Sequence, residues 1–475
     1  MKLDGIDIDT TLKELELGLA QEKELSPALR SMIGVLILIV KLLTNRVGLN
    51  SRNSSKPPSS DPNRKKKPRS KSDKKAGGQK NHQGSTLKKV DDPDEIETIE
   101  IDRRRLPKGH SYQDAGVETR QVFDIEITRM ITEYRAQALV DESGKRFVAP
   151  FPKGVTKAVQ YGGSLKAHAV YMSQYQLLPY NRVAEYFSEQ LNISLSQGTV
   201  FNFNKDAFKR LAVFNEIAKK ALITSGRVHA DETGININGK GYWLHCASND
   251  LWTDFFPHEK RGCEAMDSRG ILPQFKGVLC HDHWKPYYRY KECFHALCNA
   301  HHLRELTRAH EQDDQVWAKA IKDLLEEMNQ TVLDADNSLG EPETRKYLMR
   351  YRKLLQKAEI ECPPPEDKRK KGQRGRVKRS KARNLLERLI NYESDVLRFM
   401  DEPDVPFTNN LGENDIRMTK VQQKISGCFR SREGAEIFCR VRGYLSTCRK
   451  QGVSSSRAMS LIFEGKLPEF VDELS

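Results

Sequence analysis

The sequence predicts a multidomain protein of the α+β class. Apolar residues recur at helical spacing in residues 1–47, in residues 154–222 and again after residue 303. Between residues 227 and 282, apolar and alternating runs predict strands, two of which carry an acidic residue. The expected segments are N-terminal helices (1–47), a basic linker (48–90), a small β-rich module (91–153), a helical region (154–222), a main domain (223–445) with helical patterns at about 303–402, and a C-terminal tail (446–475).

The N-terminal segment carries a stripe of Leu, Ile and Val residues at spacings of three and four, which predicts helix. Pro27 interrupts the stripe, so we expect two helices rather than one. Pairing with a second chain would bury the stripe, and so would packing on the rest of the protein. We favour self-association, because the linker that follows offers no core to pack on.

The cysteine pattern indicates a reducing compartment, and we expect a cytoplasmic protein. The nine cysteines include none before Cys246, and their odd number argues against a disulfide framework. The N-terminus lacks the basic-then-apolar pattern of a signal peptide. The apolar run Ile33–Leu43 is shorter than the roughly 20 residues that cross a bilayer, and it contains Lys41. We therefore expect no membrane span.

The linker concentrates positive charge in a segment that cannot fold alone. Residues 51–90 contain 13 Lys and Arg residues but two acids, in a chain whose net charge is +14. Ser, Asn, Pro, Gly and Lys dominate residues 48–86, so too little apolar surface is available to offset the entropy of ordering. A solubilising tail would have this composition, but a flexible arm that binds nucleic-acid phosphates is favoured. The residues expected to bind are Arg64, Lys65, Lys66 and Lys67.

The helical region contains a pattern typical of a helix-turn-helix. A helix expected over residues 178–187 is followed by a turn near 191–194, and Ser196 is a suitable N-cap for a second helix. In a helix-turn-helix the second helix enters the major groove of DNA. Its candidate contacts are Gln197, Thr199 and Asn202. An ordinary helical hairpin would have the same spacing.

Two predicted strands each deliver one acid. Asp231 lies inside the strand expected over residues 227–238, and Asp282 ends the strand expected over residues 277–282. An acid within an apolar strand is costly unless it is paired or bound to a metal. Carboxylate oxygens suit Mg²⁺ or Mn²⁺, and two such ions support in-line phosphoryl transfer. That chemistry usually needs a third acid.

Glu413 is the best candidate for the third acid. A helix is expected after Pro406, and Glu413, Arg417 and Lys420 would lie along one face of it. A carboxylate followed by two cations suits a metal ligand beside a DNA backbone. From spacing alone, a surface helix with an ordinary Glu–Arg pair explains the pattern as well. Asp415 lies elsewhere on the helix and is a weaker candidate.

Several motifs closely resemble the transposases of the insertion sequence 66 family, which are DDE transposases. The motifs occur in the family's order and span most of the chain. They are Asn53–Asp61, Asp231–Thr233, His281–Tyr288, His295–Leu306 and Val405–Gly452. The resemblance implies an RNase H-like (retroviral integrase-like) catalytic domain, with a helical insertion between the second Asp and the Glu. Helical patterns at residues 316–333, 343–360 and 385–400 fill that interval.

The resemblance also implies a mechanism and partners. Asp231, Asp282 and Glu413 become the ligands of Mg²⁺ (or Mn²⁺), and the reaction becomes hydrolysis at transposon ends followed by attack of the 3′-hydroxyl on target DNA. Double-stranded DNA, a homo-oligomer and accessory proteins of the same element are the expected partners, in a bacterial cytoplasm and at the nucleoid. A related nuclease without strand transfer and a catalytically silent DNA-binding protein remain alternatives.

One region departs from the family pattern. Family members usually carry a small zinc module with Cys pairs before the helix-turn-helix. Here alternation at residues 122–128 and 131–135 predicts strands, but no Cys precedes Cys246. Thiolates therefore cannot hold zinc in residues 91–153, and we expect a degenerate module.

Three further groups of residues are candidate contacts. Cys298 and His301 have the spacing of zinc ligands, but we favour no zinc and expect His301 and Arg304 to orient Asp282 or bind a phosphate. Trp284 is expected to stack on an unpaired base, although core packing would explain its aromatic neighbours equally. The acid-free tract 368–383 is expected to clamp DNA, with a solvated face as the alternative. Its candidate contacts are Lys368, Arg369, Lys370 and Lys371.

Overall fold

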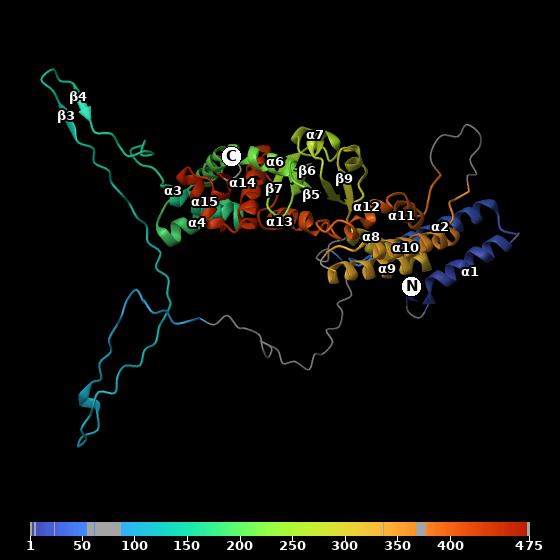
Figure 1. Ribbon diagram of the computed structural model, residues 1–475, viewed down its shortest axis with the longest axis horizontal. Coiled ribbons are helices and arrows are strands. Elements are labelled where there is room, and N and C mark those ends of the chain that lie inside the picture. The colour runs from blue at the N-terminus through green and yellow to red at the C-terminus, as the bar shows by residue number, and fades with distance from the viewer. Residues whose placement is uncertain are drawn as a thin grey trace. The chain divides into compact units, whose positions relative to one another are not determined.

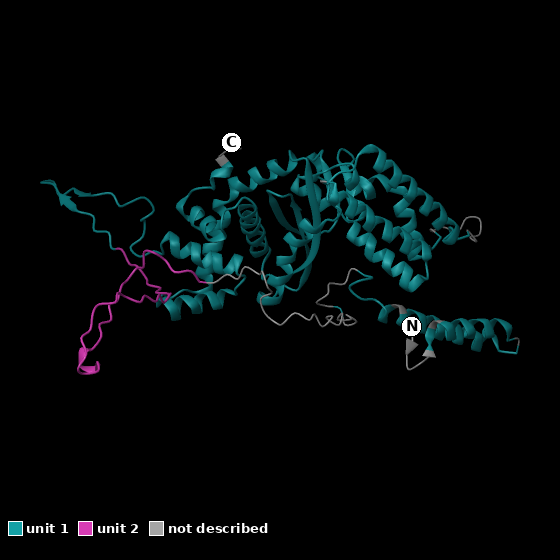
Figure 2. Cartoon of the chain, turned by 60° about the horizontal axis from the view of Figure 1, so that its bottom comes forward, with its two compact units in different colours: residues 1–64, 133–475 teal, residues 65–132 magenta. Residues whose placement is uncertain are grey.

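The computed structural model describes residues 2–3, 6–22, 24–54, 61, 87–335, 337–366 and 377–472. Helices and three sheets occur along this part of the chain, which confirms the α+β class (Figure 1). The chain divides into two compact units (Figure 2). One contains residues 1–64 and 133–475, and the other contains residues 65–132.

Two short strands and a helical hairpin begin the first unit. Strands β1 (Lys2–Leu3) and β2 (Ile6–Asp7) pair antiparallel, and helices α1 (Ile8–Gln21) and α2 (Pro27–Val47) follow. The break predicted at Pro27 is confirmed. Ser26 caps α2 by accepting a hydrogen bond from the backbone N–H of Leu29 at 3.2 Å, and proline suits the first turn of a helix.

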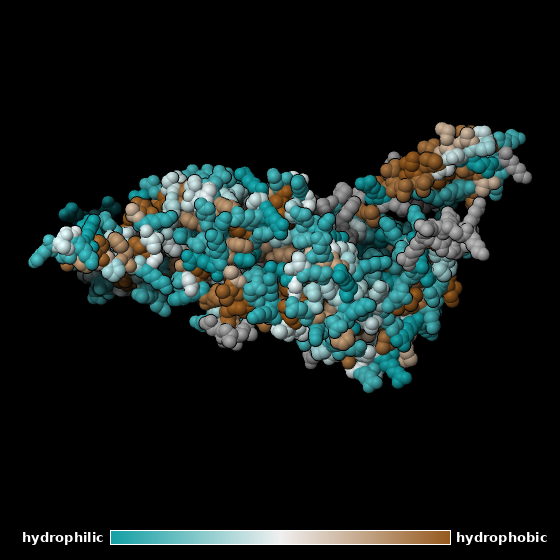
Figure 3. Space-filling model, turned by 90° about the horizontal axis from the view of Figure 1, so that it is seen from above, coloured by the Kyte–Doolittle hydropathy of each residue, from teal (hydrophilic) through white to brown (hydrophobic). Residues whose placement is uncertain are grey.

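Helix α2 is apolar and largely exposed. Met32, Leu36 and Leu43 are 65%, 60% and 57% exposed, and Figure 3 shows a hydrophobic patch over this hairpin. The window Pro27–Thr44 is 18 residues long and 6% buried, and by length and composition alone it could cross a membrane. The apolar stretch is thus longer than the run Ile33–Leu43 indicates. A helix that packs against a partner chain has the same properties.

The second unit contains little regular structure among its described residues, 87–132. One 3-10 turn, η2 (Arg103–Arg105), occurs there. The strands predicted at residues 122–128 and 131–135 are wrong, since neither segment forms a strand. Apolar side chains such as Val122 (90% exposed) and Met130 (91% exposed) have no core to cover them. The alternation of apolar and polar residues was therefore not sufficient to form a strand, because a strand is stable only when it has a partner strand and a buried face.

The β structure of residues 91–153 is confined to a hairpin in the first unit. Strands β3 (Ala138–Val140) and β4 (Arg146–Val148) pair antiparallel, with Leu139 opposite Phe147. Both strands are exposed along their whole length.

A five-stranded sheet forms the centre of the first unit. Its strands are β5 (Arg227–Ile237), β6 (Lys240–Ser248), β7 (Thr253–His258), β8 (Val278–His281) and β9 (Phe294–Leu297). Their order is β7-β6-β5-β8-β9, in which β5, β6 and β7 are antiparallel neighbours while β8 and β9 run parallel to β5. Asn238 and Gly239 have φ values of 49° and 81°, which a two-residue hairpin turn requires. The strands predicted over residues 227–238 and 277–282 are confirmed as β5 and β8, and β9 was not anticipated.

Helices on the β7 side join distant parts of the chain. They are α3 (Gly163–Val170), the π-helix η3 (Tyr171–Tyr175), α4 (Tyr180–Leu191), α5 (Gln197–Arg210), α6 (Ala212–Ile223), α14 (Arg432–Lys450), α15 (Ser455–Glu464) and α16 (Glu469–Asp472). Val170 and Val200 share one core with Val441 and Met459. Residues 446–472 are therefore not the tail that the sequence suggested, because α15 buries its apolar face against α3.

The helices of the insertion lie on the β9 side (Figure 1). Short segments α7 (Cys263–Arg269), η4 (Leu272–Gln274) and η5 (Lys285–Arg289) flank β8, and the insertion follows β9. It comprises α8 (Asn299–Asp313), α9 (Val316–Asp334), α10 (Glu341–Glu361), α11 (Lys381–Asn391), α12 (Glu393–Leu397) and η6 (Arg398–Met400). Leu325, Tyr351 and Leu386 join Cys280 and Leu297 of the sheet in one core. Helix α13 (Asn410–Ser426) then returns to β5 and β6.

Candidate metal centre

Strand β5 carries two adjacent acids that point to opposite faces of the sheet. Side chains alternate along a strand, so Asp231 shares a face with His229 while Glu232 faces the other way. His229 contacts the start of α13, and Glu232 contacts Arg261 and Tyr287. Asp231 therefore faces α13.

Asp282 follows the end of β8, the strand next to β5. The two strands are parallel, with His229 opposite Cys280, so Asp282 comes beside Asp231. The Oδ1 atom of Asp282 accepts a hydrogen bond from the backbone N–H of Trp284 at 2.9 Å, which orients the carboxyl group. Burial raises the pKa of Asp282 above its ordinary value.

Glu413 lies in the first turn of α13, and Asn409 attaches that turn to the sheet. Oδ1 of Asn409 lies 2.7 Å from Nδ1 of His229, and its Nδ2 donates to the carbonyl of Ala230 at 2.9 Å. Since Nδ2 is the donor, Oδ1 must accept from the His229 ring. A Cβ at Gly412 would lie 3.4 Å from that of His229, so the helix approaches β5 closely. Asn409 was not anticipated from the sequence as part of the site.

The structure brings the three predicted acids into one electrostatic cluster. The pKa of Asp231 rises from 3.8 to about 8. Burial is the largest cause, and the charges of Glu232, Glu413 and Asp282 add to it. Carboxylates held together in this way are stabilised by a divalent cation, and oxygen ligands suit Mg²⁺ or Mn²⁺. These residues supply oxygen ligands of the predicted kind, but among the described residues the three side chains whose ligand atoms lie within 4.8 Å of one another are Cys298, His301 and Glu413 rather than the three acids.

A fourth carboxylate, Glu232, is neutralised by protein groups. Arg261 donates to its Oε1 from Nε at 2.8 Å and from Nη2 at 2.5 Å, and the Tyr287 hydroxyl donates to its Oε2 at 2.5 Å. The Arg261 guanidinium lies 4.2 Å from the ring of Trp284 and 4.9 Å from that of Trp243. The predicted base-stacking residue Trp284 thus packs on Arg261, and no sequence pattern pointed to that arginine.

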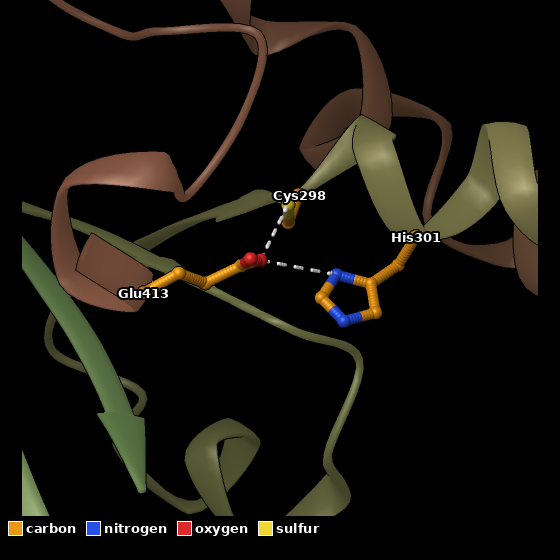
Figure 4. Close-up of side chains that lie close together, drawn as sticks. All are labelled: Cys298, His301 and Glu413. Carbon is orange, nitrogen blue, oxygen red and sulfur yellow. Dashed lines mark hydrogen bonds and ion pairs between the residues drawn. The ribbon is translucent and has the colours of Figure 1, made fainter. Parts of the chain in front are cut away.

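His301 lies beside Glu413 rather than in contact with Asp282. Its Nδ1 is 3.7 Å from Oε1 of Glu413, and Sγ of Cys298 is 3.7 Å from the same oxygen (Figure 4). Burial lowers the pKa of His301 to about 4, so its ring is neutral near pH 7. Arg304 lies on the next turn of α8, and its Nε is buried without a hydrogen-bond partner among the described residues.

The other predicted contacts lie on exposed surfaces or outside the described residues. Gln197 and Asn202 are exposed on α5, and the Thr199 hydroxyl lies 2.9 Å from that of Ser196. The Ser196 cap is confirmed by its bond to the Thr199 N–H at 3.0 Å. The exposed cations Arg417 and Lys420 lie on α13, where Lys420 reaches the Gly234 carbonyl. The predicted contacts outside the described residues are Arg64, Lys65, Lys66, Lys67, Lys368, Arg369, Lys370 and Lys371.

Comparison with known proteins identifies the family. The model of the Transposase IS66 family matches residues 158–437, more than half of the chain. The chain belongs to this family. The matched residues include Asp231, Asp282 and Glu413. A Family of unknown function (DUF6444) matches residues 10–88, which contain the helical hairpin and the basic linker.

A curated relative covers a small part of this IS66 family member. The chain is 37% identical over 70 residues to Uncharacterized protein y4jO of Sinorhizobium fredii. That match covers 15% of this chain and 22% of the relative, so the chain spans about a fifth of that protein's length.

Proposed function

We propose that this chain is a DDE transposase that cuts DNA at transposon ends and joins the freed 3′ ends to target DNA. The observation that carries the proposal is the cluster of Asp231, Asp282 and Glu413 within an IS66 family member. The strand order β7-β6-β5-β8-β9 supports an RNase H-like domain, because it combines an antiparallel meander with two further parallel strands. The helical insertion between Asp282 and Glu413 agrees with that assignment.

The three carboxylates would hold Mg²⁺ or Mn²⁺ at the edge where β5, β8 and α13 meet. When bound, these ions activate a water or a 3′-hydroxyl and stabilise the leaving oxygen of an in-line phosphoryl displacement. The chain's own groups orient the ligands. The Trp284 N–H holds Asp282, and Asn409 holds the turn that carries Glu413. Arg261 and Tyr287 bind the Glu232 carboxylate, and these bonds offset part of the negative charge that Glu232 adds beside Asp231 and Asp282.

Helices α4 and α5 are the proposed DNA-end reader, a helix-turn-helix. Asn192 adopts a left-handed conformation (φ 50°) that ends α4, and α5 begins at Gln197 after the Ser196 cap. Gln197→Ala/Asn202→Ala is expected to raise the Kd for the transposon end at least about 30-fold, because the two lost base contacts cost about 1–3 kcal/mol each. Fluorescence anisotropy with end and scrambled DNA measures this. Gln190→Ala, exposed on α4, is the control. Equal end affinity in the double variant would exclude α5 as the reader.

Self-association is proposed to occur through the exposed face of α2, since two transposon ends must be held together. Leu36 and Leu43 are 60% and 57% exposed, and burying such leucines stabilises a dimer by about 1.5–3 kcal/mol each. Leu36→Lys/Leu43→Lys is expected to convert the oligomer to monomer in sedimentation experiments. Thr10→Lys, which adds the same charge at an exposed position of α1, should leave the mass unchanged. An unchanged oligomer in the double variant would rule out this face.

The function itself is tested with the native chain, end DNA and target DNA in Mg²⁺ or Mn²⁺. Cleavage and strand transfer with either ion, and neither product in a chelator, are the expected results. Cleavage without joined product would favour a nuclease. End binding without any cleavage, even with the element's accessory proteins added, would favour the silent DNA-binding alternative.

A further inference from the structure

Against the expectation from the sequence that Cys298 and His301 bind no zinc, we propose that Cys298, His301 and Glu413 form a second metal site, selective for Zn²⁺. The three side chains come from both ends of the insertion. Cys298 caps α8, His301 lies in the first turn of α8, and Glu413 lies in the first turn of α13. Figure 4 shows the three groups pointing toward one another.

The distances are those of a tetrahedral zinc site before the ion enters. Oε1 of Glu413 lies 3.7 Å from Sγ of Cys298 and 3.7 Å from Nδ1 of His301. The three ligand atoms all lie within 4.8 Å of one another. Tetrahedral coordination at Zn–S of about 2.3 Å and Zn–N or Zn–O of about 2.0 Å places neighbouring ligands roughly 3.3–3.6 Å apart. Binding of the ion therefore requires ligand atoms within 4.8 Å of one another to approach by up to about 1.5 Å.

The local contacts prepare these groups to act as ligands. The backbone N–H of Asn409 donates to Sγ of Cys298 at 3.1 Å, which offsets part of the rise in the pKa of this thiol that burial causes. Nδ1 of His301 is buried without a hydrogen-bond partner among the described residues, so its acceptor position faces the cluster unused. Cys298 now donates its S–H proton toward Glu413. On binding, Zn²⁺ replaces that proton, which leaves to the solvent.

The ligand types of this site favour Zn²⁺ over the Mg²⁺ proposed to bind Asp231, Asp282 and Glu413. Thiolate and imidazole ligands suit Zn²⁺, whereas Mg²⁺ prefers oxygen and octahedral geometry. The fourth position of the zinc site would remain for water. His301 and Glu413 side chains are 26% and 33% exposed, so an ion can enter from solvent.

Zinc binding at this site would regulate the metal centre, a consequence that rests on the proposed function. Glu413 is a proposed ligand in both metal sites. When its carboxylate binds Zn²⁺ with Cys298 and His301, it can no longer bind Mg²⁺ together with Asp231 and Asp282. Zn²⁺ is therefore expected to inhibit Mg²⁺-dependent strand transfer, with inhibition that depends on Cys298 and His301.

The test measures metal binding directly on the full-length, untagged chain after removal of metals by chelator. One Co²⁺ per chain is expected to give a thiolate-to-cobalt charge-transfer band, which one equivalent of Zn²⁺ abolishes. Cys298→Ser and His301→Gln are expected to lose that band and to weaken Zn²⁺ binding at least about tenfold in competition with a chromophoric chelator. Cys428→Ser, which removes an exposed cysteine elsewhere, should bind as the native chain does. Thermal unfolding shows that each variant is folded.

Strand transfer is then measured in Mg²⁺ with increasing Zn²⁺. Inhibition of the native chain and of Cys428→Ser, together with resistance of His301→Gln, would support the regulatory site. The metal-binding measurement does not depend on activity. A native chain that shows the cobalt band but no strand transfer would therefore contradict the proposed function and still support the zinc site. Absence of the band in the folded native chain, or an equal band in folded Cys298→Ala, would overturn the zinc site.

Discussion

Glu413→Gln is expected to lower Mg²⁺-dependent cleavage and strand transfer by about 1,000-fold or more, which corresponds to about 4 kcal/mol of transition-state stabilisation. The amide keeps the size of the side chain but removes the charge that the cation needs. Asp282→Asn should have an effect of the same order, because Asp282 contributes to the same cluster. Binding of end DNA should persist in both variants, since the proposed reader lies on α4 and α5.

The matched control is Asp415→Asn, two residues further along α13. Asp415 accepts from Nζ of Lys450 at 2.7 Å and from the Ser446 hydroxyl at 3.3 Å, and its side chain is 14% exposed. Asp415 therefore forms an ion pair between α13 and α14 and does not belong to the acidic cluster. We expect a loss of stability but catalysis within about tenfold of the native chain. Full activity in Glu413→Gln, or inactivity of a folded Asp415→Asn, would identify a different third acid.

The sequence was most informative where the pattern is local. Apolar and alternating runs predicted the strands between residues 227 and 282 and placed Asp231 and Asp282 on two of them, because such patterns depend on residues that are close in sequence. Periodicity also predicted the helices between residues 316 and 400, and the family resemblance implied that they form an insertion. The family of the chain was predicted from the resemblance of several motifs, and the family match to residues 158–437 confirms that prediction.

The contacts that complete the site join residues far apart in the chain. His229 and Asn409 are 180 residues apart, and Cys298 and Glu413 are 115 apart, so no period of two or 3.6 residues links them. Strand β9 was missed because only its last two residues are buried, so it lacks the continuous apolar run of the equally short β8, whose four residues are all buried. Residues 122–135 have the alternation of strands, but their side chains are exposed and no sheet forms there. A pattern predicts an element only where a partner buries it.

Asn409→Ala is expected to reduce strand transfer about 10- to 100-fold without removing any metal ligand. The change deletes the side-chain bonds to His229 and to the Ala230 carbonyl, while the backbone N–H bond to Cys298 remains. Asn409 is 2% exposed, so each buried partner left unpaired costs about 1–3 kcal/mol. The first turn of α13 then loses its attachment to β5, and Glu413 is held less firmly against the cluster.

A positioning role can be distinguished from a purely structural one by the metal requirement. If Asn409 positions Glu413, Asn409→Ala should need a higher Mg²⁺ concentration for half-maximal activity, and saturating Mn²⁺ should restore part of the rate. Asn410→Ala, at the exposed next position, should change neither quantity. A variant that unfolds more readily but keeps the native Mg²⁺ requirement at low temperature would show that Asn409 contributes to stability alone. The site would then depend on the close packing of Gly412 against His229 to hold Glu413 in place.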